Sequence, residues 1–308
     1  IAGYMGLGNW NALIKNVHLT GNINVSGNRF VGGLVGYQTC STSFISSSSV
    51  GNANSSVNIS ASGTQTDFFG SGDGVGGLVG YQDNGEIYNT IAYGNVIGRN
   101  YIGGLVGYAK GVISYSEAVQ GTIYSDGFSV GGFVGELANN KWITDSYSIK
   151  TINHTSNNTT DGIGGFVGNN RGHITNSYAV ATINVTDKSQ FIGGFVGINE
   201  GIITESKTLV TLNADYSSFA SGFVGINHGG IYRSRAMGNL NTNYDGSGFV
   251  GWNSWESDAT IVDSISSVNI NFTGTGTNRY LSGFVFENNN GSIINSLYTG
   301  TISKNSQN

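Results

Sequence analysis

Short apolar segments recur along the chain in a fixed order, and each recurrence begins with Gly-Gly-(Leu/Phe)-Val-Gly or a close variant. Full copies of this motif start at Gly32, Gly76, Gly103, Gly131, Gly164 and Gly193, and weaker copies start at Ala2, Ser221, Ser247 and Ser282. Neighbouring copies are separated by 26 to 44 residues. Periods of this length are typical of repeat proteins, in which each unit packs on its neighbours. The sequence therefore predicts one structural unit used ten times.

Two further segments complete each repeat. An Ile followed three residues later by Ser or Thr comes after the motif, as in Ile174/Ser177, and an (Asn/Thr)-(Ile/Val/Leu) pair closes the unit, as in Thr182-Ile183. A polar residue also follows seven of the motifs, namely Gln38, Gln82, Asn170, Asn199, Asn227, Asn253 and Asn288. Short segments that are rich in branched residues and separated by Gly and Asn predict three β-strands per repeat.

Three short strands cannot bury their apolar side chains alone, whereas stacked repeats place Val on Val and Ile on Ile along one axis. We therefore expect residues 1–308 to form a single all-β unit, a parallel β-solenoid of about ten three-strand coils. Parallel crossover connections favour right-handed winding. We interpret the Asn/Gln and Ser columns as ladders that satisfy backbone groups at the turns. Because Ile1 begins inside a repeat and neither end offers a capping helix, we expect a segment of a longer chain, or one that associates end to end.

Composition excludes several other classes of protein. Glycine accounts for 50 of 308 residues, proline is absent, and only 10% of residues are charged. The net charge of −5 with 13 Lys and Arg offers no concentrated basic face for nucleic acid. No apolar run approaches the roughly 18 residues that cross a bilayer. The single Cys40 cannot form an internal disulfide.

One run of residues resembles a known repeat. Gly164-Gly-Phe-Val-Gly-Asn-Asn-Arg-Gly-His-Ile-Thr-Asn-Ser-Tyr-Ala179 is similar to the GLUG motif of bacterial surface and secreted proteins, and the similarity recurs in every unit. GLUG repeats occur in adhesin-like proteins, in filamentous-haemagglutinin-like proteins and in the non-catalytic part of some IgA-peptidase-like metalloproteases. The resemblance implies an extracellular or cell-surface location in a bacterium. The metalloproteases among these proteins suggest an alternative, in which the chain is a non-catalytic module of a surface protease.

Two groups of residues are candidates for ligand binding. Tyr37, Tyr81 and Tyr108 occupy the same repeat position in successive coils, where an outward-facing stack would suit sugar rings or a partner surface. Leu/Phe and Val are adjacent in the motif, and only one of two adjacent residues faces inward in a regular strand, so the orientation of the tyrosines stays open. The second group lies in the longest insertion and comprises Asp67, Phe68, Phe69 and Asp73. Insertions at one repeat position emerge on one edge of a solenoid, which is often the binding edge.

The third segment of each repeat carries two outward-facing polar residues, as in Thr151-Ile-Asn153, Thr182-Ile-Asn184 and Thr211-Leu-Asn213. In stacked coils these residues form two polar columns, here called ranks. Ordinary strand-surface polarity explains such ranks. Regular hydroxyl ranks would also suit glycans or, as a lesser alternative, ice. The mixture of Asn with Thr weakens the ice hypothesis.

Catalytic patterns are mostly missing. The four histidines form no His-Glu-x-x-His motif, and we expect no metal and no cofactor. Asp145, Glu205 and Asp263 share one column, interrupted by Asn176 and Arg233, which favours a surface charge ladder over a catalytic pair. We therefore expect a non-catalytic stalk or adhesive segment that binds glycans or partner proteins. The alternative from another class is a polysaccharide-active β-helix enzyme that uses Asp145 or Asp263.

Overall fold

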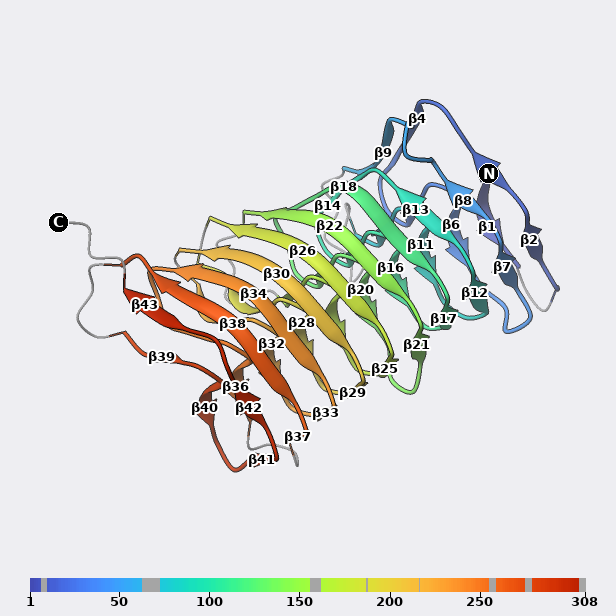
Figure 1. Cartoon of the computed structure of the whole chain (residues 1–308). Coiled ribbons are helices and arrows are strands. Elements are labelled where there is room, and N and C mark those ends of the chain that lie inside the picture. Colours follow the sequence, from blue (N-terminus) through green and yellow to red (C-terminus); the bar gives the residue numbers. More distant parts are fainter. Residues whose placement is uncertain are drawn as a thin grey trace.

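Four parallel sheets run along the long axis of the molecule and wind into a solenoid of about nine turns (Figure 1). This computed structural model describes residues 1–6, 10–62, 73–155, 162–186, 188–215, 217–254, 259–274 and 279–304. All paired strands in these ranges are parallel, and each strand pairs with its equivalent in the next coil, as in the register Ile152↔Ile183. The described ranges contain no helix, and hence none that could span a membrane. The predicted all-β parallel solenoid is confirmed.

Sheets D and A carry the first half of each coil. Sheet D consists of β5 (Val31–Gly32), β10 (Val75–Gly76), β15 (Ile102–Gly103), β19 (Val130–Gly131), β23 (Ile163–Gly164), β27 (Gln190–Gly193), β31 (Ser218–Ser221), β35 (Gly246–Ser247) and β39 (Leu281–Ser282). Sheet A consists of β1 (Ala2–Met5), β6 (Val35–Gln38), β11 (Val79–Gln82), β16 (Val106–Ala109), β20 (Val134–Leu137), β24 (Val167–Asn170), β28 (Val196–Asn199), β32 (Val224–Asn227), β36 (Val250–Asn253) and β40 (Val285–Asn288).

Sheets B and C complete the coil. Sheet B consists of β2 (Leu13–Lys15), β7 (Phe44–Ser46), β12 (Glu86–Tyr88), β17 (Val112–Ser114), β21 (Trp142–Thr144), β25 (His173–Thr175), β29 (Ile202–Thr204), β33 (Gly230–Tyr232), β37 (Thr260–Val262) and β41 (Ser292–Ile294). Sheet C consists of β3 (His18–Leu19), β4 (Ile23–Gly27), β8 (Ser49–Val50), β9 (Val57–Ala61), β13 (Ile91–Tyr93), β14 (Asn95–Gly98), β18 (Glu117–Ser125), β22 (Tyr147–His154), β26 (Tyr178–Val185), β30 (Lys207–Ala214), β34 (Arg235–Thr242), β38 (Ile265–Phe272), β42 (Leu297–Tyr298) and β43 (Ile302–Lys304).

The prediction of three strands per coil was wrong, because the glycine motif spans two strands. In one coil β23 ends at Gly164, the chain reverses at Gly165-Phe166, and β24 begins at Val167. A Cβ atom on Gly164 would lie 2.0 Å from the carbonyl oxygen of Val167, and one on Gly165 would lie 2.2 Å from that of Gly194. The first glycine therefore permits the reversal, and the second permits close contact with the next coil.

The reversal also changes which motif residues are buried. Phe166 and Val167 are adjacent, yet both side chains are fully buried. The expectation that only one of the two faces inward was wrong, because Phe166 lies at the corner between β23 and β24 rather than within a regular strand. The same corner position is filled by Leu34, Leu78, Leu105, Phe133, Phe195, Phe223 and Phe249 in other coils, all fully buried.

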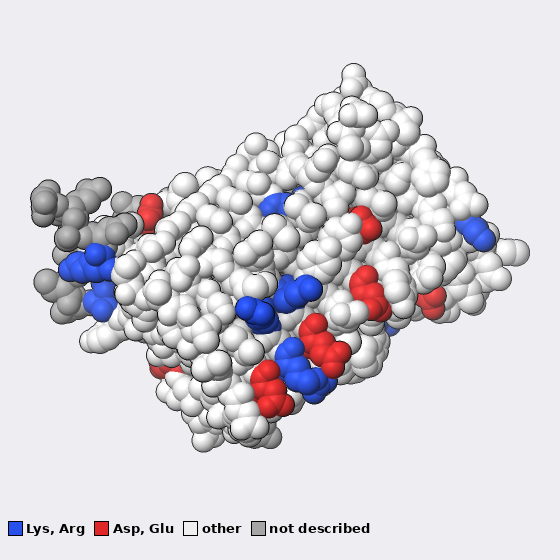
Figure 2. All heavy atoms as spheres, viewed as in Figure 1, with Lys and Arg blue, Asp and Glu red and all other residues white. Residues whose placement is uncertain are grey.

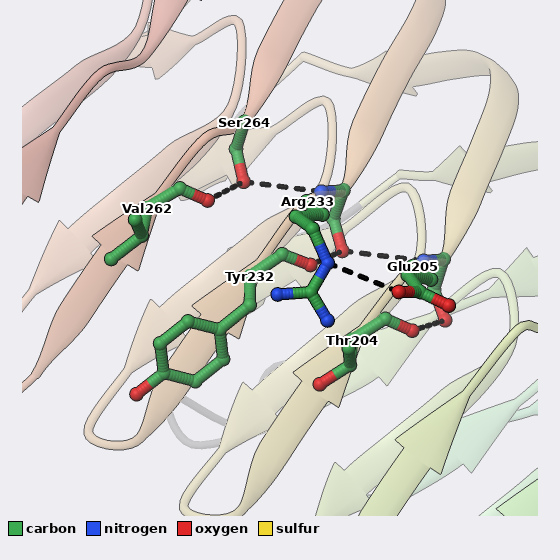
Figure 3. Close-up of polar contacts among 8 residues, drawn as sticks. Thr204, Glu205, Tyr232, Arg233, Val262 and Ser264 are labelled. Carbon is green, nitrogen blue, oxygen red and sulfur yellow. Dashed lines mark hydrogen bonds and ion pairs between the residues drawn. The ribbon is translucent and has the colours of Figure 1, made fainter.

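The predicted serine ladder is confirmed at the turn from sheet B to sheet C. Ser264 Oγ donates a hydrogen bond to the carbonyl oxygen of Val262 at 2.9 Å and accepts one from the N–H of Ser234 at 3.2 Å (Figure 3). Equivalent bonds link Ser116, Ser146, Ser177 and Ser206. The hydroxyl therefore satisfies two backbone groups that the turn leaves unpaired.

The predicted amide ladder is confirmed at the ends of the sheet A strands. Asn199 is fully buried, its Nδ2 donates to Asn227 Oδ1 at 2.7 Å, and its Oδ1 accepts from Asn170 Nδ2 at 2.7 Å. The ladder continues through Asn253 to Asn288. Each amide thus bonds to the coils on both sides, which fixes the register of the stack.

Replacing Asn199 with Leu tests the contribution of this ladder. The substitution keeps the branched shape and the number of heavy atoms but removes the partners of Asn170 Nδ2 and Asn227 Oδ1 in the buried interior. We expect the free energy of unfolding to fall by about 2 kcal/mol, since each unsatisfied buried group costs about 1–3 kcal/mol. Urea denaturation followed by circular dichroism measures this change.

Asn184 provides the matched control for that experiment. Its Nδ2 donates to Asn153 Oδ1 at 2.8 Å in a second amide ladder, on the half-buried outer face of sheet C. Water can replace this bond, so Asn184→Ala should cost less than about 1 kcal/mol. Equal losses for the two variants would show that the buried ladder contributes no more than the surface one.

Candidate functional site

The tyrosines predicted from the sequence lie one above the other on sheet A. β6, β11 and β16 place Tyr37 opposite Tyr81 and Tyr81 opposite Tyr108. The ring centroids are 4.9 and 5.1 Å apart, and the planes differ by 9° and 7°. The structure therefore brings the three rings together as a continuous stack, which Tyr4 extends at 5.2 Å.

The stack leaves little ring surface to solvent. Phe30 packs edge-on against Tyr37 and Tyr81, and Tyr101 does so against Tyr108. Tyr37 and Tyr108 are half-buried, while Tyr81 is only 3% exposed. Because each ring face is covered by the next ring, a ligand here would meet ring edges and hydroxyl groups. A binding role for these tyrosines stays a prediction, and face-on stacking of a sugar would require the rings to separate.

Charged residues continue the column beyond the tyrosines. Lys110 Nζ lies 5.4 Å from the ring centroid of Tyr81, 5.6 Å from that of Tyr108, and 3.2 Å from Asp83 Oδ1. Glu136 takes the ladder position after Tyr108, and its buried carboxylate lies 3.2 Å from Arg171 Nη1. Burial raises the pKa of Glu136, and the Arg171 cation opposes that rise. Burial, with the Glu136 charge adding to it, raises the pKa of Tyr108 to about 12.

A shallow groove of about 310 Å³ opens beside this network. It is lined by Asp83, Tyr108, Lys110, Ala138, Asn139, Lys141 and Arg171. The cations Lys110 and Arg171 are already paired with Asp83, Glu136 and Glu200. The groove is thus electrostatically balanced, which makes it a poor site for a strongly charged ligand.

Of the four residues predicted on the insertion, Asp73 alone falls in the described part of the chain. Asp67, Phe68 and Phe69 lie outside the described residues. Asp73 is 2% exposed, and its Oδ1 accepts a hydrogen bond from Asn100 Nδ2 at 2.8 Å. Its backbone carbonyl accepts from the N–H of Phe30, so Asp73 supports the residue that packs against the tyrosine stack. Its contacts in the structure are those of a buried positioning residue.

The column of acidic residues lies at the turn from sheet B to sheet C. Asp145 and Asp263 are separated by four coils, which is about 19 Å at the usual spacing of strands. Glu205, two coils from each, is about 10 Å from both. Carboxyl pairs in glycosidases are at most about 9.5 Å apart. The spacing therefore gives no support to a catalytic pair in this column.

Hydrogen bonds and an ion pair connect this column instead. Asn176 Nδ2 donates to Asp145 Oδ1 at 2.6 Å, and Arg233 Nε lies 3.0 Å from Glu205 Oε1 (Figure 3). Both charged side chains are about half exposed. Of the charge ladder expected from the sequence, the structure therefore shows the pair between Glu205 and Arg233.

Arg233→Ala tests how much the ion pair contributes. We expect a loss of at most about 1 kcal/mol in the free energy of unfolding, because solvent screens an exposed pair. Raising the salt concentration to 1 M should remove most of the difference from wild type. Arg235→Ala, at a neighbouring exposed arginine, is the control; a loss above 2 kcal/mol for Arg233→Ala alone would contradict the assignment.

Sequence reasoning missed one buried cation, Lys150. It lies in the inward column of sheet C that Ala181 and Val210 fill in the next coils, and it is 3% exposed. Its Nζ donates to the carbonyl oxygens of Gly94 at 2.7 Å, Val119 at 3.3 Å and Gln120. The preceding strand, β18, bulges between Val119 and Thr122, and the carbonyls of Val119 and Gln120 lie at this bulge. The signal in the sequence was a Lys in a column of apolar residues.

The architecture defines the class of protein as a parallel β-solenoid repeat protein. No protein-family model, curated protein or solved structure matches the chain. Among the described residues, no group of three or more His, Cys, Asp and Glu side chains could hold a metal ion.

Proposed function

We propose that this chain is a non-catalytic, adhesive β-solenoid segment of a secreted or cell-surface bacterial protein, and that it binds saccharides along its side. The observation that carries the proposal is the outer face of sheet C. Five long strands, β22, β26, β30, β34 and β38, pair over nearly their full length without a bulge and form a broad lateral surface (Figure 1). A surface of this kind presents the same groups every 4.8 Å or so, which suits a polymeric ligand.

The chemistry of this face supports a neutral ligand. Figure 2 shows that most of the face is uncharged and that charged residues gather toward its border with sheet B. Thr151, Thr182 and Thr211 lie opposite one another in one rank, and the structure gives their hydroxyl groups no hydrogen-bond partner among the described residues. Unpaired hydroxyl ranks on a surface with little charge match the hydroxyl-rich, uncharged surface of a glycan.

The neighbouring rank of asparagines is already engaged. Asn213 Nδ2 donates to Asn184 Oδ1 at 2.8 Å, and Asn184 Nδ2 donates to Asn153 Oδ1 at 2.8 Å. Bonds within the ladder leave these amides fewer free donors and acceptors for water. This arrangement favours a structural role for the asparagine rank and gives no support to an ordered ice-like water layer.

A glycan array tests the proposed function. The full 308-residue chain is applied to immobilised neutral oligosaccharides, and the same glycans are assayed for newly released reducing ends. We expect selective binding to a subset of glycans with no release of reducing ends. A blank array would contradict saccharide binding, and release of reducing ends would contradict a non-catalytic function.

The tyrosine stack provides a second arm of that experiment. Replacing Tyr37, Tyr81 and Tyr108 with Phe removes three hydroxyl groups but keeps the stacked rings. Loss of binding in this variant would place the ligand on the exposed edge of the stack. Unchanged binding would assign the ligand to another part of the surface.

A further inference from the structure

A groove on the side of the solenoid lies where strands of sheet C from four consecutive coils end. β9, β14, β18 and β22 pair in order (Figure 1). The residues at and just beyond their ends line an open groove of about 550 Å³. We call this the sheet C groove; the lining residues used below are Ile97, Arg99, Tyr124, Asp126 and Asn153. A volume of this size falls in the usual range for small-molecule sites.

Two exposed apolar side chains form one wall of the groove. Ile97 and Tyr124 lie opposite each other on β14 and β18, and they are 41% and 44% exposed. Unlike the rings on sheet A, the ring of Tyr124 packs against no other aromatic ring in the described ranges. Its face is therefore free to stack against the C–H groups of a sugar ring.

The amide ladder of sheet C ends at this groove. Asn153 Oδ1 accepts from Asn184, but the next residue in the rank is Tyr124, which has no amide to accept from Asn153. Within the described chain, Asn153 Nδ2 consequently has no hydrogen-bond partner. A half-buried amide donor is left at the edge of an exposed aromatic ring.

Two charged side chains at the groove are also without partners. Neither the Arg99 guanidinium nor the Asp126 carboxylate forms a hydrogen bond or an ion pair with any described residue, and both are exposed. In the groove beside sheet A, by contrast, Lys110 is paired with Asp83. One cation and one anion add no net charge, so the groove favours an uncharged ligand with many hydroxyl groups.

We infer that the sheet C groove is a binding site for a pyranose unit of a neutral oligosaccharide. The sugar ring stacks on Tyr124, Asn153 Nδ2 donates to one ring hydroxyl, and Asp126 and Arg99 accept from and donate to others. This inference rests on the proposed saccharide-binding function and assigns its site. The ligand then lies at the end of the regular face, where polar side chains no longer find hydrogen-bond partners in the next coil.

Titration calorimetry with variants tests the assignment. The probe is the tetrasaccharide that gives the strongest signal among β-linked glucose, galactose, mannose and N-acetylglucosamine tetrasaccharides on the array. Tyr124→Ala should raise the dissociation constant at least about tenfold, and Asp126→Asn about threefold. Tyr124→Phe keeps the ring and should bind within about threefold of wild type.

Tyr88→Ala is the matched control, because Tyr88 is 42% exposed on sheet B, away from the groove. It should bind like wild type, and circular dichroism should show that every variant is folded. Wild-type binding that survives Tyr124→Ala unchanged would overturn the groove assignment and leave the proposed function standing. Absence of wild-type binding to every tetrasaccharide would overturn both.

Discussion

Phe195→Ala should lower the free energy of unfolding by about 3–5 kcal/mol, the usual cost of truncating a fully buried phenylalanine. Phe195 is stacked between Phe166 and Phe223, with both ring centroids 5.0 Å away and the planes within 6° of parallel. Truncation therefore removes two ring contacts and opens a cavity on the axis of the stack. Guanidinium denaturation followed by circular dichroism measures the loss.

The chain supplies the control for this experiment. Leu34, Leu78 and Leu105 fill the same corner in earlier coils, so the corner accepts leucine without a change of backbone. Phe195→Leu should accordingly cost less than about 2 kcal/mol. A loss below 1 kcal/mol for Phe195→Ala would show that the phenylalanine stack is not a main source of stability.

The repeat made most of the fold predictable. The regular recurrence of Val and Ile predicted that the coils stack in parallel. The recurrence of small polar residues predicted which positions form ladders, as Asn199 and Ser264 show. The strands of sheet D were not predicted, because several, such as Ile163–Gly164, are two residues long and lie inside the glycine motif. A strand of that length shows no alternation of apolar and polar residues.

The candidate sites were less predictable than the fold, since they depend on departures from the repeat. The spacing of the tyrosines showed that they share a column. Their burial, however, depends on Phe30 and Tyr101, which lie just before strands β5 and β15 of sheet D. Those two residues have φ of 51° and 54°, a left-handed conformation that a bulky side chain rarely adopts and that no local pattern indicates. The sheet C groove arises where the asparagine rank ends at Tyr124, which only the register of the strands reveals.

Lys150 should make the stability of the protein depend on pH between about 7 and 10. Burial lowers the pKa of Lys150 to about 7 from the usual 10.5, although its three carbonyl acceptors favour the charged form. In this window the unfolded chain binds a proton that the folded chain lacks, so the free energy of unfolding rises with pH. The rise is at most about 1.4 kcal/mol per pH unit. It ends near pH 10, where tyrosines such as Tyr101, whose pKa burial raises to about 12, begin to act in the opposite direction.

Lys150→Met should remove this rise, because methionine fills a similar volume and carries no proton in either state. The measurement is urea denaturation at half-unit steps from pH 6.5 to 9.5, with the slope of the unfolding free energy compared between wild type and variant. Lys110→Met is the control: contacts with Tyr81 and Asp83 raise the pKa of Lys110, so its titration lies above this window and the slope should persist. A wild-type slope that Lys150→Met leaves unchanged would show that the buried ammonium keeps its proton throughout. The three carbonyl bonds would then outweigh desolvation, and Lys150 would act as a permanent cation that closes the bulge.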